Sequence, residues 1–125
     1  MTTPTIWHEF PGVPVPGSDV CALDDIPDGG GRMFAFGCGE DKFRLLVLRE
    51  HEKCLGYVNS CPHFGMPLAR QNKSLIIDPY RSVRCNVHLA SFRWQDGYCD
   101  SGDCEGASLV SVPLEVKTGR VVVST

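Results

Sequence analysis

Two short stretches contain the side chains with the clearest chemistry. Cys61 and His63 are one residue apart in CPHFGMPL (61–68), and Cys85 and His88 are two residues apart in CNVH (85–88). Thiolate sulfur and imidazole nitrogen are common protein ligands for zinc, copper and iron. The chain therefore offers two cysteines and two histidines, one of each from two separate places.

The spacing within the first stretch bears on the kind of metal site. In an extended chain, residues i and i+2 point to the same side, roughly 6–7 Å apart at a rise of ~3.3 Å per residue. That separation is awkward for two ligands of one small ion, but it suits one ligand on each of two neighbouring metals. A binuclear iron–sulfur cluster can use this set, with both thiolates on one iron and both imidazoles on the other. A mononuclear Cys2His2 zinc site accepts the same residues and stays open as an alternative.

The pattern C-x-H, a spacer and C-x-x-H resembles the Rieske family. The resemblance extends over nearly all of 19–124, through VCALDDIPDGGGR (20–32), FRWQDGYC (92–99) and SLVSVPLEVKTGRVVV (108–123). It implies one [2Fe-2S] cluster per chain. The implied ligands are Cys61 and Cys85 on one iron and His63 and His88 on the other.

The resemblance also implies a function, that of a soluble ferredoxin that moves one electron at a time. We expect the ferredoxin component of an oxygenase system, a monomer or weak oligomer, with a flavoprotein reductase and a terminal oxygenase or reductase as protein partners. We do not expect the chain to catalyse a reaction by itself. Two alternatives are a small Rieske subunit of a reductase complex, similar to that of nitrite reductase, and a redox sensor that uses Cys99 and Cys104. Some relatives of the family have lost their ligands and are structural subunits, but all four ligand residues are present here.

High-potential members of the family place a serine and a tyrosine two and four residues after the second histidine, where this chain has Ala90 and Phe92. They also carry an extra cysteine in each ligand loop, and this chain has none at the matching positions. Fewer hydrogen bonds to the cluster sulfurs stabilise the reduced state less. The resemblance therefore implies the low-potential class, towards the lower end of a range of about −150 to +300 mV.

The elements that must position these residues are short strands separated by turns. The expected strands lie at 20–23, 33–37, 43–50 and 54–59, then one ending at Val116 and a last one at 121–124, with a hairpin turn at 117–119. The absence of a convincing amphipathic helix and this strand spacing predict an all-β fold, an antiparallel sandwich or small barrel. Residues 60–106 are rich in Cys, His, Gly and Pro and lie between the two β halves, so we expect an inserted cluster-binding subdomain there.

Residues 1–18 are rich in proline and predict an arm that wraps the surface or extends from it. The resemblance implies a Rieske-type domain over residues 19–125. Relative to the family, QNKSLIIDPYRS (71–82) is the expected insertion, and CDSGDCEG (99–106) is a third loop without the usual proline.

The composition limits the functional class and the compartment. The chain has 125 residues, 42% of them hydrophobic, and a formal net charge of −3 with a pI near 5.7. The acidic balance argues against a nucleic-acid partner, and no apolar run approaches the length of a membrane span. The N-terminus has neither the basic nor the apolar region of a signal peptide, which predicts a cytoplasmic protein.

The other cysteines and histidines have simpler interpretations. We expect Cys21, Cys38 and Cys54 to be small core residues, and His8 and His51 to lie on the surface. For Cys99 and Cys104, we favour two ordinary thiols over a disulfide or an additional metal-binding site. We expect Phe92 and Trp94 to pack beneath the cluster loop rather than to relay electrons.

Overall fold

The structure is a computed structural model, and it describes residues 6–10, 12–37, 42–60, 62, 67–85, 90–102 and 106–124. Its regular elements are strands and three short 3-10 turns. The strands are β1 (Asp19–Ala22), β2 (Gly31–Phe36), β3 (Phe43–Glu50), β4 (Lys53–Val58), β5 (Ile76–Asp78), β6 (Ser82–Arg84), β7 (Ser91–Arg93), β8 (Cys99–Ser101), β9 (Ser111–Val112), β10 (Leu114–Lys117) and β11 (Arg120–Val123). The 3-10 turns are η1 (Trp7–Glu9), η2 (Leu23–Asp25) and η4 (Asn72–Ser74).

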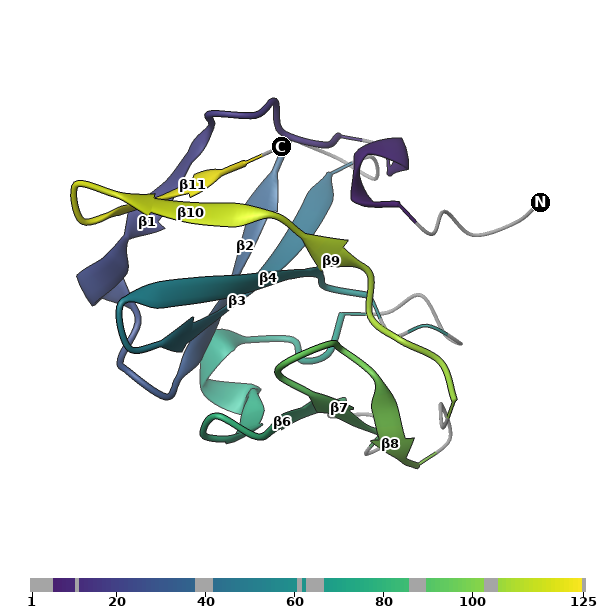
Figure 1. The fold of residues 1–125 in the computed structure, drawn as a ribbon. Coiled ribbons are helices and arrows are strands. Elements are labelled where there is room, and N and C mark those ends of the chain that lie inside the picture. Colours follow the sequence, from purple (N-terminus) through teal and green to yellow (C-terminus); the bar gives the residue numbers. More distant parts are fainter. Residues whose placement is uncertain are drawn as a thin grey trace.

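The strands form three antiparallel sheets, which Figure 1 shows stacked as successive layers. The outer sheet has the order β1-β11-β10, the middle sheet β2-β3-β4-β9 and the small sheet β5-β6-β7-β8. The outer and middle sheets draw strands from both ends of the chain, whereas the small sheet comes from 76–101 alone. The expected all-β fold with a separate unit inserted between its halves is therefore present.

The middle sheet is covered on both faces, which explains why β3 is a nearly continuous run of apolar residues. Successive side chains of a strand point to opposite faces. Phe43, Leu45 and Val47 of β3 belong to the core shared with the outer sheet, which also holds Cys21, Ile26 and Val121. Leu46 and Leu48 belong to the core shared with the small sheet, which also holds Val83, Phe92 and Trp94. A strand buried on both faces needs apolar residues at consecutive positions.

Most expected strands have matching strands in the structure. β3 has the predicted bounds, and β1, β2, β4, β10 and β11 lie within two residues of theirs. The predicted turn at 117–119 is a two-residue turn, because Lys117 pairs with Arg120 and both Thr118 and Gly119 have positive φ. This matches the backbone of a type I′ hairpin.

The segment 71–82, expected as an insertion, provides part of the small sheet. It contains η4 and β5, and β5 pairs with β6 through Ile76–Arg84, Ile77–Val83 and Asp78–Ser82. Asn72 accepts a hydrogen bond from the backbone N–H of Met33, at 2.6 Å, and so attaches this segment to the edge strand β2.

The described part of the N-terminal arm lies against the main body. Trp7, Phe10 and Val13 pack on the core between the outer and middle sheets. The Gly17 N–H also donates to the Val123 carbonyl at 2.7 Å. Within the described residues, no helix is long and apolar enough to span a membrane.

Candidate metal centre

Cys85 is the one predicted ligand that lies within the described residues. It follows β6 directly and is buried as a free thiol, with an exposed fraction of 1%. Its backbone N–H donates to the carbonyl of Ala90 at 2.8 Å. This hydrogen bond joins the two ends of the second candidate segment, residues 85–89, and extends the β6–β7 pairing by one step.

The first candidate segment, residues 61–66, begins and ends at a buried polar clamp. Asn59 is buried at the end of β4, with an exposed fraction of 3%. Its side-chain oxygen accepts a hydrogen bond from the backbone N–H of Leu68 at 2.9 Å, and its own N–H donates to the Arg44 carbonyl at 2.9 Å. The chain is therefore drawn back to β4 nine residues after it leaves the strand.

A third segment, residues 100–106, returns to its starting point in the same way. The N–H of Cys99 donates to the Ala107 carbonyl at 2.8 Å, and the N–H of Gly106 donates to the Cys99 carbonyl at 3.2 Å. Cys99 is fully buried, and its sulfur donates to the Ser101 carbonyl at 3.2 Å.

The ends of all three segments meet in one buried cluster. Leu68, Cys85, Ala90 and Cys99 are members of the core between the middle and small sheets. The second and third segments also leave the small sheet at the same end, because Ser91 pairs with both Arg84 and Ser101. This arrangement fits a site assembled from residues of separate segments.

Three predicted ligands, Cys61, His63 and His88, lie outside the described residues, as do Met66, Asn86, Val87 and Cys104. The described part of the chain contains no group of three or more Cys, His, Asp or Glu side chains that could hold a metal ion. Cys85 is therefore placed by the structure, and the rest of the ligand set stays a prediction.

The core beneath the candidate site is held by two buried aromatic residues. Trp94 donates its indole N–H to the Ser82 carbonyl at 3.0 Å, which ties β7 to β6. Tyr57 of β4 donates its hydroxyl to the Trp94 carbonyl, so the small sheet is bonded to the middle sheet. Burial raises the pKa of Tyr57 to about 12. Phe92 and Trp94 are buried in this core, as packing residues are expected to be.

Of the remaining predictions for cysteine and histidine residues, four are confirmed and one is untested. Cys21 and Cys54 are buried free thiols, and burial raises the pKa of Cys54 to about 11. His8 and His51 are exposed, as predicted, whereas Cys38 lies outside the described residues.

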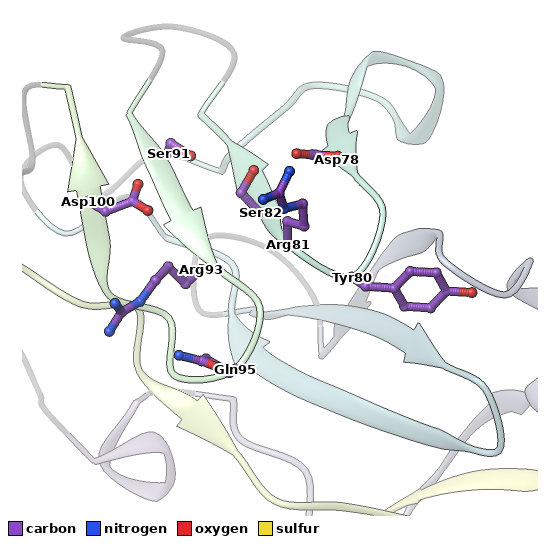
Figure 2. A pocket seen from close by; sticks show the side chains of 8 residues that line it. All are labelled: Asp78, Tyr80, Arg81, Ser82, Ser91, Arg93, Gln95 and Asp100. Atoms are coloured by element: carbon purple, nitrogen blue, oxygen red, sulfur yellow. The ribbon is translucent and has the colours of Figure 1, made fainter.

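A polar hollow of about 400 Å³ lies on the small sheet, and Figure 2 shows the side chains that line it. They include two arginines, Arg81 and Arg93, and two aspartates, Asp78 and Asp100. Val83 and Phe92 of the same strands belong to the core, so the hollow lies on the opposite face of the sheet. Its lining has no cysteine or histidine, so its side chains are not those of an iron–sulfur site.

Asn59 is a buried polar residue beside the candidate site that sequence reasoning missed. It is polar and directly follows the apolar strand β4, two residues before Cys61. A buried amide needs hydrogen-bond partners, so a polar residue between a buried strand and a candidate metal-binding stretch is the signal that points to such a clamp.

Comparisons with known proteins agree with this geometry. The family model described as the Rieske [2Fe-2S] domain matches residues 18–118. The chain is 29% identical over 107 residues to the ferredoxin component of an alkene monooxygenase system from Xanthobacter autotrophicus (strain ATCC BAA-1158 / Py2). That match covers 86% of this chain and 80% of the relative.

Two solved structures share the fold. One is a chain in the complex of reduced oxygenase and oxidised ferredoxin of carbazole 1,9a-dioxygenase, with a TM-score of 0.68, 24% identity and coverage of 85% of this chain and 90% of that chain. The other is the ferredoxin of carbazole 1,9a-dioxygenase from Nocardioides aromaticivorans IC177, with a TM-score of 0.62, 18% identity and coverage of 88% and 98%. The all-β fold with its inserted small sheet is thus the one that the resemblance implied. The chain belongs to the Rieske [2Fe-2S] domain family, and its cofactor is a [2Fe-2S] cluster.

Proposed function

We propose that this chain is the ferredoxin of an oxygenase system, a carrier of single electrons between a flavoprotein reductase and a terminal oxygenase. The observation that carries the proposal is the 29% identical relative, named as the ferredoxin component of a monooxygenase system, which aligns over most of both chains. The family match and the shared fold of an oxygenase ferredoxin support it.

We further propose that Cys61 and Cys85 bind one iron, and that His63 and His88 bind the other. The burial of Cys85 supports this assignment, because a thiolate ligand beneath an apolar core is shielded from water. The shared core at the ends of the three segments supports it as well, since it holds their ends together. When bound, the cluster accepts one electron and gives it back.

The described residues would keep that site rigid and dry. The Asn59 clamp and the Cys85–Ala90 hydrogen bond fix the ends of the two candidate segments. Ala90 and Phe92 are fully buried and carry no hydroxyl group, which supports a low reduction potential. We expect protein-film voltammetry to give a midpoint potential of about −150 mV.

The domain boundaries and the compartment are part of the proposal. Residues 1–18 form an arm, and residues 19–125 form the Rieske-type domain with its cluster-binding subdomain at about 60–106. We place the protein in the cytoplasm, whose reducing conditions suit free thiols such as Cys21 and Cys54.

The decisive experiment is electron paramagnetic resonance of the purified, dithionite-reduced protein. Mixed His and Cys ligation lowers the average g value below that of an all-cysteine cluster, so we expect a signal of the mixed type. Cys85→Ala and His88→Ala should abolish the signal and the visible absorption. The matched controls Cys54→Ala and His51→Ala, at a buried cysteine and an exposed histidine outside the site, should retain both.

A colourless protein with stoichiometric zinc, or a His88→Ala variant with an unchanged spectrum, would contradict the ligand assignment. If the cluster is present but neither a flavoprotein reductase reduces it nor an oxygenase oxidises it, the carrier role is wrong while the cofactor stands.

A further inference from the structure

Four cations lie beside the two candidate ligand segments. Arg44 is on β3 opposite Asn59, whose N–H donates to the Arg44 carbonyl at 2.9 Å, and Asn59 is two residues before Cys61. Arg70 follows the first segment on its other side, and both arginines line one hollow of about 240 Å³ together with Pro67. Lys73 lies in η4, just before β5, and Arg84 directly precedes Cys85.

The strand register places Lys73 and Arg84 at the same end of the small sheet. Ile76, the first residue of β5, pairs with Arg84, the last residue of β6, and Arg84 pairs on its other side with Ser91. The second candidate segment leaves the sheet at this end, and η4 enters the sheet there. We name Arg44, Arg70, Lys73 and Arg84 the loop-side cations.

The loop-side cations are available to a partner. Arg70, Lys73 and Arg84 are exposed and Arg44 is half-buried. The ion pairs among the described residues involve Arg49, His51, Lys53, Arg93, Lys117 and Arg120, and none involves a loop-side cation. A positive charge that forms no ion pair with a described residue can attract an external anion.

Basic and acidic residues are unevenly distributed along the chain, although the net charge is only −3. Residues 60–95 contain five Lys or Arg and one acidic residue, whereas 96–105 contain four acidic residues and no basic one. The candidate segments 61–66 and 85–89 contain no Asp or Glu, so neither segment supplies a carboxylate to the loop-side cations. Of this acidic stretch, Asp100 lies on β8, at the opposite edge of the small sheet from β5.

An apolar side chain accompanies these charges. Ile76 is 39% exposed and is paired across the strands with Arg84. Docking surfaces of transient complexes commonly combine apolar area with a charged rim, and encounters between electron carriers bury comparatively little area.

We propose that the loop-side cations and Ile76 form the docking surface for an acidic patch on the protein that exchanges electrons with this chain. The inference rests on the proposed carrier function and names the chemistry of the partner's surface. The cations lie beside the two candidate ligand segments, so they steer an acidic partner towards these segments.

The test begins with charged inorganic oxidants and the cluster-loaded protein. Ferricyanide, a trivalent anion, and hexaammineruthenium(III), a trivalent cation, each oxidise the reduced cluster in a stopped-flow instrument. At an ionic strength of about 10 mM, Arg70→Gln/Arg84→Gln should react with ferricyanide about tenfold more slowly than the wild type, and faster with the ruthenium complex. At about 0.5 M salt, the wild type and the variant should differ less than about twofold because the charges are screened.

The matched control is Lys53→Gln/Lys117→Gln, which removes the same two positive charges from hairpins outside the loop-side surface. Its rates should stay within about twofold of the wild type, since screening weakens distant charges. Equal rates for wild type and Arg70→Gln/Arg84→Gln at low salt, or equal effects of the two double variants, would overturn the proposal.

Direct binding gives a second readout that does not depend on electron transfer. Calorimetry with poly-L-glutamate as the acidic probe should detect binding to the wild type and the control, and binding at least about tenfold weaker to Arg70→Gln/Arg84→Gln. Tighter binding of a short double-stranded DNA than of poly-L-glutamate would assign the surface to nucleic acid and overturn the proposal. If both reagents oxidise the cluster, but neither the oxidation rates nor the binding of poly-L-glutamate depend on Arg70 and Arg84, only the docking surface is wrong. If no cluster forms, the proposed function itself fails.

Discussion

Single buried polar groups hold the candidate site together at the residue scale. Asn59 is buried at the end of β4 and satisfies the N–H of Leu68, whereas Asn72 makes a hydrogen bond of the same kind to Met33 from an exposed position. A buried donor that loses its acceptor costs more than an exposed one, because water can replace the partner only at the exposed site.

Asn59→Ala should therefore lower the free energy of unfolding by about 1–3 kcal/mol, because it leaves the Leu68 N–H without a partner. Asn72→Ala, which removes the same group from an exposed position, should cost less than about 1 kcal/mol. Urea unfolding followed by circular dichroism measures both, and equal losses in the two variants would show that Asn59 is no clamp.

Asp28 is a second residue whose charge is set by its neighbours. The backbone N–H of His51 and the hydroxyl of Tyr80 both donate to its carboxylate, at 2.8 Å each, and they lower the pKa of Asp28 to about 2. The Tyr80 ring also stacks on His51, with ring centres 5.1 Å apart. These contacts connect the loop after β1 with the β3–β4 turn and the β5–β6 turn.

A lowered carboxyl pKa makes a pH-dependent contribution to stability. The usual pKa of Asp is about 3.9 in an unfolded chain, so the ionised form stabilises the fold above about pH 4 and loses this effect as the pH falls to about 2. The stability of the wild type relative to Asp28→Asn should therefore decline across that window in urea titrations. Tyr80→Phe, which removes one donor, should narrow the window, and a pH-independent difference would contradict the assignment.

At the scale of elements, β4 runs through the middle of the molecule with its neighbours in close contact. A Cβ atom on Gly56 would lie 2.7 Å from the Val112 carbonyl oxygen and 2.7 Å from Cδ1 of Leu114. Gly56 pairs with Val112 in the β4–β9 ladder, so the backbone that carries this oxygen is held in place.

Gly56→Ala should destabilise the protein by about 1–3 kcal/mol, because β9 must move to admit the methyl group. Gly119→Ala serves as the comparison: its Cβ would meet no atom within 4 Å, and only its φ of +75° resists the change. We expect that variant to lose about 1 kcal/mol. Thermal unfolding measures both, and a neutral Gly56→Ala would show that β9 is not firmly held.

On the scale of the whole molecule, two separate hydrophobic cores lie on opposite faces of the middle sheet. One core joins the outer and middle sheets, and the other joins the middle sheet to the small sheet. Tyr57 bridges the second junction, because its hydroxyl donates to the Trp94 carbonyl in a buried position.

Tyr57→Phe should lower the free energy of unfolding by about 1–2 kcal/mol near neutral pH, since the Trp94 carbonyl loses its donor. The pKa of Tyr57 is raised to about 12 from a usual value of about 10. Its contribution is therefore complete below pH 10 and is lost as the pH rises to about 12. The stability difference between wild type and variant should shrink over that range, whereas Tyr98→Phe, at an exposed tyrosine, should change stability by less than about 0.5 kcal/mol.

Local sequence patterns were enough to predict β1, β2, β3, β4, β10 and β11, the hairpin turn, and the buried thiols of Cys21 and Cys54. The consecutive apolar residues of β3 indicate burial on both faces, and Thr118-Gly119 indicates a tight turn. Both features can be read locally, because strand periodicity and turn geometry depend on residues that are neighbours in the chain. The pairing of β5 with β6 was missed, since 71–82 was expected as an insertion. A three-residue strand carries too short a pattern to be told from a loop.

What the sequence determined by itself is the chemistry: which residues can bind metal, and which segments are apolar enough to be strands. Only the tertiary structure decided that residues flanking the three segments share one core, that Asn59 closes the first segment, and that Lys73 and Arg84 lie at one end of the small sheet. These features join residues far apart in the chain, and they exist only once the sheets are stacked and the strands are in register.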